Sequence, residues 1–167
     1  MKLFSANIED LRTLYVTNLQ KALDMEQKIT KALPTMIEKS TDPELANAFR
    51  THLQETQGHV AKVEALLRRA TGDASTKTCK VINGLTTEAE DSIKDATDPA
   101  IRDITLIAAG QQVEHHEIAI YGTLRTWAGI LGKTEDVNVL NSILDEEENA
   151  DQILTDISDH VNLQAAA

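Results

Sequence analysis

The amino-acid sequence predicts an all-α protein built mainly from long helices. Only 3 prolines and 7 glycines occur among the 167 residues, which is too few for the many turns of a β-sandwich or barrel. Aromatic residues make up 3% of the chain and hydrophobic residues 41%, so the core has to consist of Leu, Ile, Val and Ala, which suits packed helices. This length fits one domain, which we expect over residues 1–163.

The first helix is predicted over about residues 7–40. Apolar residues recur there at intervals of three and four, as at Leu11, Leu19 and Leu33, which is the repeat of one helix face. Pro34 falls inside this pattern. Because proline lacks a backbone N–H and crowds the preceding turn, we expect a kink or a local break there.

The second helix is predicted to begin at Thr41-Asp42-Pro43-Glu44 and to end near Ala70. This start combines a capping side chain, a proline in the first turn and an acid near the positive end of the helix dipole. Gly72 then follows as a stop signal.

Residues 73–97 are predicted to form a long crossover. Gly84 interrupts them, and Leu85, Ala89 and Ile93 give only a short amphipathic stretch, so we expect one minor helix there. A connection of this length allows the next long helix to run parallel to the second.

Two more long helices complete the predicted fold. Asp98-Pro99 repeats the earlier start signal, and the third long helix extends to about Leu131 before Gly132. The fourth covers about residues 134–160, and we expect residues 164–167 to fray. Two helical hairpins joined by one long crossover are typical of a ferritin-like four-helix bundle.

Each long helix carries a carboxylate at the spacing of its apolar face. Glu26, for example, has Ala22 four residues before it and Ile29 three residues after it. Side chains three and four residues apart share a helix face, so these acids are predicted to point inward. The candidate metal ligands are Glu26, Glu55, Glu114, Glu117, Glu147 and Asp151.

Six carboxylates in a bundle interior need cations, because burying even one unpaired carboxylate costs several kcal/mol or forces its neutralisation. Two divalent ions would supply this charge, and bridging carboxylates would serve both. Hard oxygen ligands with some imidazole suit iron, our first expectation, or manganese. Ordinary outward-facing helix carboxylates are the simpler alternative.

Four segments in this order resemble the YciF-like bacterial stress proteins, which belong to the ferritin-like superfamily near rubrerythrin. The resemblance covers nearly the whole chain. It implies a crossover four-helix bundle, a homodimer and a di-metal site at the acids named above. The segments are Met25-Glu26-Gln27-Lys28, residues 52–58, residues 113–122 and residues 144–151.

The chain departs from the usual Glu-x-x-His pattern on its second and fourth helices. His59 follows Glu55 at the fourth position, and His52 precedes it by three, so their roles as ligand or supporting partner stay open. Whether Glu146 or Glu147 faces inward also stays open.

Several other reactive side chains are expected to have ordinary roles. We expect His115 and His116 on the surface, Tyr121 in the core with a hydrogen-bonding role beside the metals as the alternative, and Cys79 as a passive thiol.

Composition excludes several classes of partner. A net charge of -11 repels nucleic acid and anionic membranes, and no apolar run approaches the length of a membrane-spanning helix. One cysteine rules out an internal disulfide framework and, with no signal peptide apparent, favours a cytoplasmic location.

The expected function is therefore a di-iron or di-manganese protein that acts in stress response, by reaction with peroxide or O₂ or by metal handling. The Cys-rich electron-transfer domain of rubrerythrin is absent, so either an external reductant or a non-redox role has to be considered. The alternatives are a metal-free or metal-stabilised helical interaction module with an acidic surface, and a many-subunit iron-storage cage.

Overall fold

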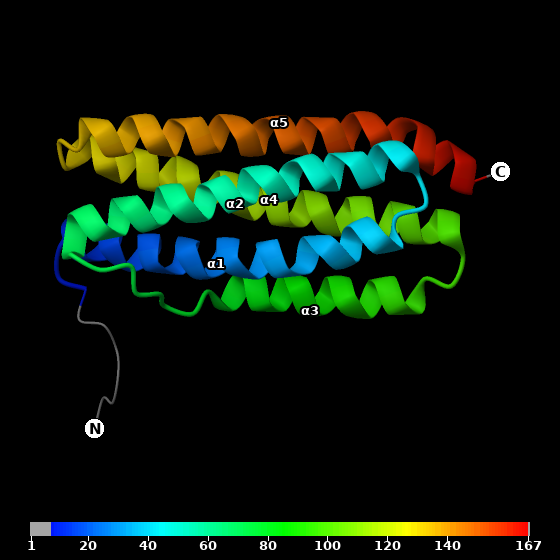
Figure 1. Cartoon of the computed structure of the whole chain (residues 1–167), viewed down its shortest axis with the longest axis horizontal. Coiled ribbons are helices and arrows are strands. Elements are labelled where there is room, and N and C mark those ends of the chain that lie inside the picture. The colour runs from blue at the N-terminus through cyan, green and yellow to red at the C-terminus, as the bar shows by residue number, and fades with distance from the viewer. Residues whose placement is uncertain (1–7, 167) are drawn as a thin grey trace, which may run out of the picture.

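The computed structural model describes residues 8–166, and the described chain is all-α, as predicted. It contains no β-strand within those residues. None of the helices found there combines the length and apolarity needed to cross a membrane. The helices, shown in Figure 1, are α1 (Leu11–Lys39), α2 (Pro43–Thr71), α3 (Lys80–Asp95), α4 (Pro99–Ile130) and α5 (Thr134–Ala165).

The four long helices surround a shared core, and α3 lies outside them. α1 pairs with α2 and α4 pairs with α5, while α1 also packs on α4 and α2 on α5. α3 packs against α4 and, less extensively, α1. Following the colours in Figure 1 shows that α2 and α4 run in the same direction, as expected for helices joined through a crossover.

Two helix starts follow the predicted capping chemistry. The Asp42 carboxylate accepts hydrogen bonds from the backbone N–H groups of Glu44 and Leu45 at 2.9 and 3.0 Å. Asp98 makes the equivalent bonds at the start of α4, where Pro99 is the first helical residue. Each cap satisfies N–H groups that have no partner inside the helix.

The bounds of α1 and α5 differ from those predicted. α1 begins at Leu11, because Asp10 caps it by accepting a hydrogen bond from the Thr13 N–H at 2.7 Å; Asn7 lies outside the described residues. α5 extends past His160 to Ala165, so residues 164 and 165 are helical rather than frayed.

Of the two outcomes expected at Pro34, a kink or a local break, the break does not occur, because α1 continues through this residue. Pro34 lies on the exposed face of the helix. Water can therefore reach the backbone carbonyl that loses its usual N–H partner, and packing of the buried face holds the helix together.

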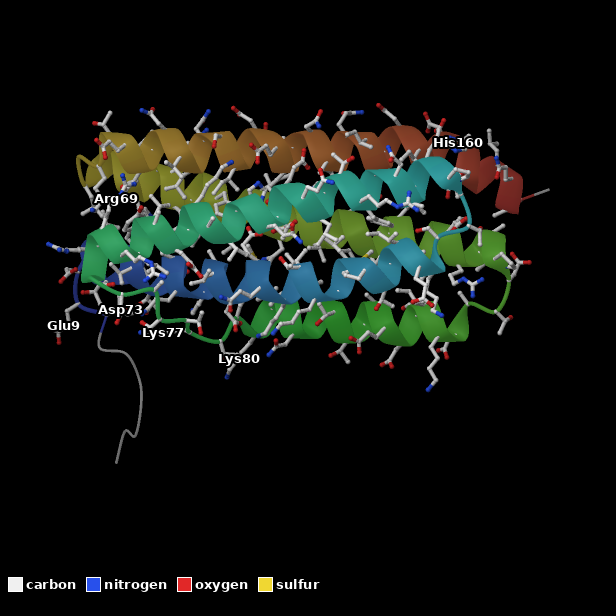
Figure 2. All side chains as sticks on the ribbon, viewed as in Figure 1. Glu9, Arg69, Asp73, Lys77, Lys80 and His160 are labelled. Atoms are coloured by element: carbon white, nitrogen blue, oxygen red, sulfur yellow. The ribbon has the colours of Figure 1, made fainter. Side chains whose placement is uncertain are left out.

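Buried acids fasten the two ends of the molecule. Asp103 in α4 accepts hydrogen bonds from the Thr41 N–H and the Asp42 N–H, both at 2.8 Å, and from the Thr41 hydroxyl. The beginning of α4 is thereby tied to the connection between α1 and α2. This is also the end of the molecule at which Figure 2 labels His160.

At the opposite end, where Figure 2 labels Arg69, Asp136 of α5 joins three helices. Its carboxylate accepts a hydrogen bond from the Tyr15 hydroxyl of α1 at 2.9 Å and contacts the Arg69 guanidinium of α2 at 3.1 Å. These contacts set the long helices in register on either side of the middle of the bundle.

The crossover is fastened to α1 before α3 begins. Figure 2 shows Asp73, Lys77 and Lys80 along this segment. The Lys77 N–H donates to the Gln20 carbonyl at 3.1 Å, and the Cys79 N–H donates to the Asp24 carboxylate at 2.8 Å. These bonds position α3 along the outer side of α1.

Candidate metal centre

Four of the six predicted acids lie together in the middle of the core. Glu26 comes from α1, Glu114 and Glu117 from α4, and Glu147 from α5. None of these residues is more than 3% exposed. The aliphatic core continues on both sides of them, with Leu23 before Glu26 and Leu33 after it on α1.

Two histidines of α2 complete the cluster. His52 places Nε2 3.2 Å from a Glu114 oxygen. His59 places Nδ1 3.0 Å from Oε1 of Glu147 and 3.7 Å from a Glu26 oxygen. Both rings are buried, so every long helix contributes at least one ionisable side chain to one site.

The six residues divide into two groups that share Glu147. Ligand atoms of His52, Glu114, Glu117 and Glu147 lie within 4.8 Å of one another, and so do ligand atoms of Glu26, His59 and Glu147. Oε1 of Glu147 is the oxygen near His59, whereas Oε2 lies 3.9 Å from Nδ1 of His52. One carboxylate can therefore reach toward both groups.

Many polar atoms of this cluster face one another without an aligned hydrogen bond. They include both oxygens of Glu117 and of Glu147, both ring nitrogens of His52, Nδ1 of His59, and Oε2 of Glu26 and of Glu114. Buried polar atoms are nearly always partnered in proteins, because leaving them unpaired is costly. The donor set, carboxylate oxygen with imidazole nitrogen, suits iron, manganese or zinc.

Burial and mutual repulsion raise the pKa values of three of these acids, Glu26, Glu114 and Glu117. Burial, followed by the charge of Glu147, raises the pKa of Glu117 well above its usual range. Burial raises the pKa of Glu26 as well, and raises the pKa of Glu114 to about 8 against the opposing pull of His52.

Burial acts on the pKa values of the two histidines in the opposite direction. Burial alone would lower their pKa values, but the surrounding carboxylates outweigh it and raise the pKa of His52 to about 9 and that of His59 to about 10. Without metal ions, the site therefore takes up extra protons. It is a place where positive charge is strongly favoured.

A further acid and a lysine hold His59 from its outer side. Nε2 of His59 lies 2.5 Å from a Glu146 oxygen, and Nζ of Lys62 contacts the same carboxylate at 3.0 and 3.1 Å. This leaves Nδ1 of His59 directed at Glu26 and Glu147. Such a carboxylate partner is typical of metal-ligating histidines, because it fixes the orientation of the ring.

Tyr121 plays a similar part for Glu26. Its buried hydroxyl donates a hydrogen bond to Oε1 of Glu26, which leaves Oε2 of that carboxylate as the unpartnered atom beside His59. The rings of Tyr121 and His59 are in edge-to-face contact, with centroids 6.4 Å apart. The core placement expected for Tyr121 is seen, together with the hydrogen-bonding role left as its alternative.

The structure leaves Glu55 and Asp151 at the edge of the cluster. The Glu55 side chain is 28% exposed, and its nearest contact within the cluster is Nδ1 of His52 at 3.6 Å. Asp151 is 20% exposed and pairs with exposed His115 at 3.3 Å, although its Oδ1 is buried without a partner. Neither belongs to the two buried groups of ligand atoms.

The inward face of α2 explains why His52 and His59, rather than Glu55, lie within the buried cluster. The buried residues of this helix include His52, Thr56 and His59, which recur at four and three positions. Glu55 is one residue before Thr56 and is therefore rotated by about 100° from it. The seven-residue spacing of His52 and His59, in line with Phe49 and Val63, is the sequence signal that marks them as inward.

Comparison with known proteins places the chain in a family. Residues 10–167 match the family described as domain of unknown function DUF892. Protein YciF of Escherichia coli K12 is 32% identical over 161 residues, which cover 95% of this chain and 97% of YciF.

Solved structures agree. YcfI from Rhodopseudomonas palustris is 36% identical with a TM-score of 0.88, over 92% of this chain and 98% of that chain. The Escherichia coli stress protein YciF is 31% identical with a TM-score of 0.87, over 92% and 97%. A Xanthomonas campestris protein at 23% identity and a TM-score of 0.74, over 92% and 94%, shares the fold. The chain therefore belongs to the DUF892 family and is a relative of the stress protein YciF.

Proposed function

We propose that this chain is a ferritin-like four-helix-bundle protein with a dinuclear metal centre. One metal ion would be held by His52, Glu114, Glu117 and Glu147. The other would be held by Glu26, His59 and Glu147, with Glu147 bridging the two. These are the two groups of buried ligand atoms that share one carboxylate. Glu55 and Asp151, the remaining predicted ligands, would lie next to this set.

The observation that carries the proposal is the concentration of buried carboxylate and imidazole atoms without a hydrogen-bond partner. Four carboxylates lie together with at most 3% exposure, and six of their eight oxygens have no hydrogen-bond partner. Two divalent cations would balance four ionised carboxylates while both histidines stay neutral. Iron is our first assignment and manganese the second, because both accept mixed carboxylate and imidazole ligands.

A bound iron or manganese pair would supply one-electron redox chemistry toward peroxide or O₂. The protein's own part is to exclude bulk water from the pair and to orient its ligands. Glu146 with Lys62 fixes the His59 ring, and the Tyr121 hydroxyl fixes one oxygen of Glu26. Repeated turnover would draw electrons from an external reductant, because a single cysteine, Cys79, cannot form a Cys-rich electron-transfer site.

The test is metal analysis of protein purified without chelator, combined with absorption spectra after iron is added in air. We expect about two ions per chain. A Glu26→Ala plus Glu114→Ala double variant removes one ligand from each group and should abolish loading. A Glu88→Ala plus Glu148→Ala variant removes two exposed acids from the surface and should load as the wild type does.

Equal metal content in both double variants, or no stoichiometric metal in any form, would overturn the proposal. The raised pKa values of His52 and His59 would then describe a proton-stabilised cluster. That result would favour a metal-free helical interaction module.

A role in stress response also belongs to the proposal and is supported by the similarity to the stress protein YciF. Homodimerisation and a cytoplasmic location are further parts of the proposal. Light scattering of the purified protein tests homodimerisation. A dimer is expected, and a large cage would instead indicate iron storage.

A further inference from the structure

A cavity of about 420 Å³ lies between α1, α4 and the place where the crossover enters α3. Met25 of α1 and Ile120 of α4 form part of its apolar wall, and residues 78–81 line it on the crossover side. The volume is within the usual range for small-molecule sites, about 300–1,000 Å³. None of the six residues of the buried cluster lines this cavity, so it is a separate feature of the fold.

The wall of the cavity carries a thiol beside an imidazole. Sγ of Cys79 lies 3.7 Å from Nε2 of His116, a half-buried residue of α4, and both residues line the cavity. Burial lowers the pKa of His116, so its ring is neutral at neutral pH. With its proton on Nδ1, the neutral ring can accept the thiol proton at Nε2, which is how an imidazole activates a cysteine nucleophile.

The charges around this pair favour an anion. Among the described residues that line the cavity, Lys21 and Lys80 are the only ones with charged side chains at neutral pH. Cys79 directly precedes the first residue of α3 and makes no side-chain capping bond, so the thiol lies near the positive end of that helix. Asp24, which accepts the Cys79 N–H, is itself paired with Lys28 at 2.5 Å. A negative charge on the sulfur, or on a ligand beside it, is therefore stabilised.

A disulfide with carboxylate groups fits this combination. A thiolate attacks a disulfide directly, and the S–S bond of the disulfide supplies the oxidising equivalent. The carboxylates provide the negative charge that Lys21 and Lys80 attract. A neutral oxidant of thiols, such as hydrogen peroxide, would gain no such attraction.

We propose that Cys79 and His116 form a reactive pair that undergoes exchange with small disulfides that carry carboxylate groups. The thiol proton moves to Nε2 of His116, and Sγ forms a new S–S bond with one sulfur of the disulfide while the original S–S bond breaks. The departing thiolate takes the proton from His116 and leaves as a thiol. Cys79 is thereby oxidised to a mixed disulfide, and the other half of the small disulfide is reduced. Neither residue belongs to the proposed metal ligands, so this inference does not depend on the proposed function.

The test uses three disulfides of similar size, namely anionic dithiodiglycolate, neutral bis(hydroxyethyl) disulfide and cationic cystamine. Because Cys79 is the only thiol of the chain, the mass added to the protein reports exchange at this residue. Each rate in the folded protein is divided by the rate for the urea-unfolded chain, which removes the intrinsic reactivity of the reagent. We expect this ratio to be about tenfold or more higher for dithiodiglycolate than for cystamine. The net charge of -11, acting alone, would attract cystamine instead.

The two lysines of the cavity have a matched control. Lys21→Gln plus Lys80→Gln should remove the preference for dithiodiglycolate. Lys31→Gln plus Lys94→Gln, which changes two exposed lysines outside the cavity, should keep it. Both double variants have the same net charge, so a difference between them comes from the position of the lysines.

His116→Gln tests the proton acceptor. Glutamine keeps a polar side chain but cannot take up the proton, so exchange with all three disulfides should slow by about tenfold or more while their order of preference is retained. His115→Gln, at the exposed neighbouring position, should react as the wild type does. Circular dichroism checks that each variant is folded.

The absence of exchange in the folded wild type, or a ratio for dithiodiglycolate no higher than that for cystamine, would overturn this inference. Equal effects of the two lysine pairs would do the same, because they would show a general effect of net charge. A wild-type rate in His116→Gln would refute the role of the imidazole. The comparison of the three disulfides uses the wild type alone, so it decides the matter even where a variant fails to fold.

Discussion

The two oxygens of the Glu147 carboxylate lie near different histidines of the cluster. Its Oε1 lies 3.0 Å from His59, and its Oε2 lies 3.9 Å from His52. Both oxygens are buried without an aligned hydrogen bond. The residues on either side of it in α5 are placed differently. Glu148 is exposed, and Glu146 contacts His59 from outside the cluster. A one-residue change of position along α5 therefore changes the role of a glutamate completely.

Replacing the shared carboxylate should remove ligands from both positions. We expect Glu147→Gln to lower the metal content from about two ions to below one per chain, because an amide is a weaker ligand and does not offset the cation charge. Elemental analysis after desalting measures this. Glu148→Gln is the control, and an equal loss in both variants would show that only surface charge matters.

Glu146 should tune metal affinity without changing stoichiometry. It orients the His59 ring through a 2.5 Å contact and is itself held by Lys62. We expect Glu146→Gln to weaken metal binding about 10- to 100-fold, the range found for such outer partners. Competition with a chelator measures the affinity, and an affinity equal to that of wild type would contradict this role.

Among the elements, α2 shows how far sequence reasoning reaches. Its start at Asp42-Pro43 and its end at Gly72 follow from local capping chemistry and are confirmed. Which of its polar residues face inward depends on a rotation of about 100° per residue, so spacing alone did not show that Thr56 is buried while Glu55 lies at the edge of the cluster. His52 and His59 share the stripe with Phe49 and Val63, yet a histidine at such a position is equally compatible with an ordinary core role.

Two further limits of prediction from the sequence concern the continuity of α1 and the packing of the long helices. The break expected at Pro34 did not occur, because propensity is local whereas burial of Leu33 and Ile29 acts on the whole helix. The acids Glu26, Glu114, Glu117 and Glu147 could be anticipated from spacing alone. Their mutual distances could not, since these depend on how α1, α4 and α5 pack.

The tie between α4 and the α1–α2 connection should contribute measurably to stability. Asp103 is 3% exposed and accepts three hydrogen bonds, so Asp103→Ala leaves two backbone N–H groups and a hydroxyl without their acceptor. We expect a loss of about 1–3 kcal/mol in the free energy of unfolding.

Urea denaturation measures the effect of Asp103→Ala. Asp98→Ala, which removes an exposed helix cap on the same element, should cost about 1 kcal/mol and serves as the comparison. An Asp103→Ala variant no less stable than the wild type would contradict the structural role.

For the whole molecule, the central cluster predicts an unusual pH dependence. In the metal-free chain the pKa values of His52 and His59 are raised to about 9 and 10, and that of Glu114 to about 8. The folded state therefore binds more protons than the unfolded chain above the ordinary carboxylate range, so stability falls as pH rises. The histidine contribution is complete below about pH 6.5 and is lost as the pH rises through 9 to 10.

We expect the melting temperature of metal-free protein to fall between pH 6 and pH 9, as measured by differential scanning fluorimetry. Metal ions would replace the extra protons, so the loaded protein should show a weaker or reversed trend. Glu117→Gln, which removes one buried acid, should flatten the metal-free profile. A metal-free melting temperature that rises over this range would contradict the proposed protonation.

The proposed ligands are also divided between the two hairpins of the chain. Glu26, His52 and His59 belong to the α1–α2 hairpin, whereas Glu114, Glu117 and Glu147 belong to the α4–α5 hairpin. Neither hairpin supplies every residue of either proposed ligand group. Metal binding would therefore require that the two hairpins are packed together. A protease cut within residues 73–79 should yield two fragments that stay associated in the presence of iron or manganese. A chelator should separate them.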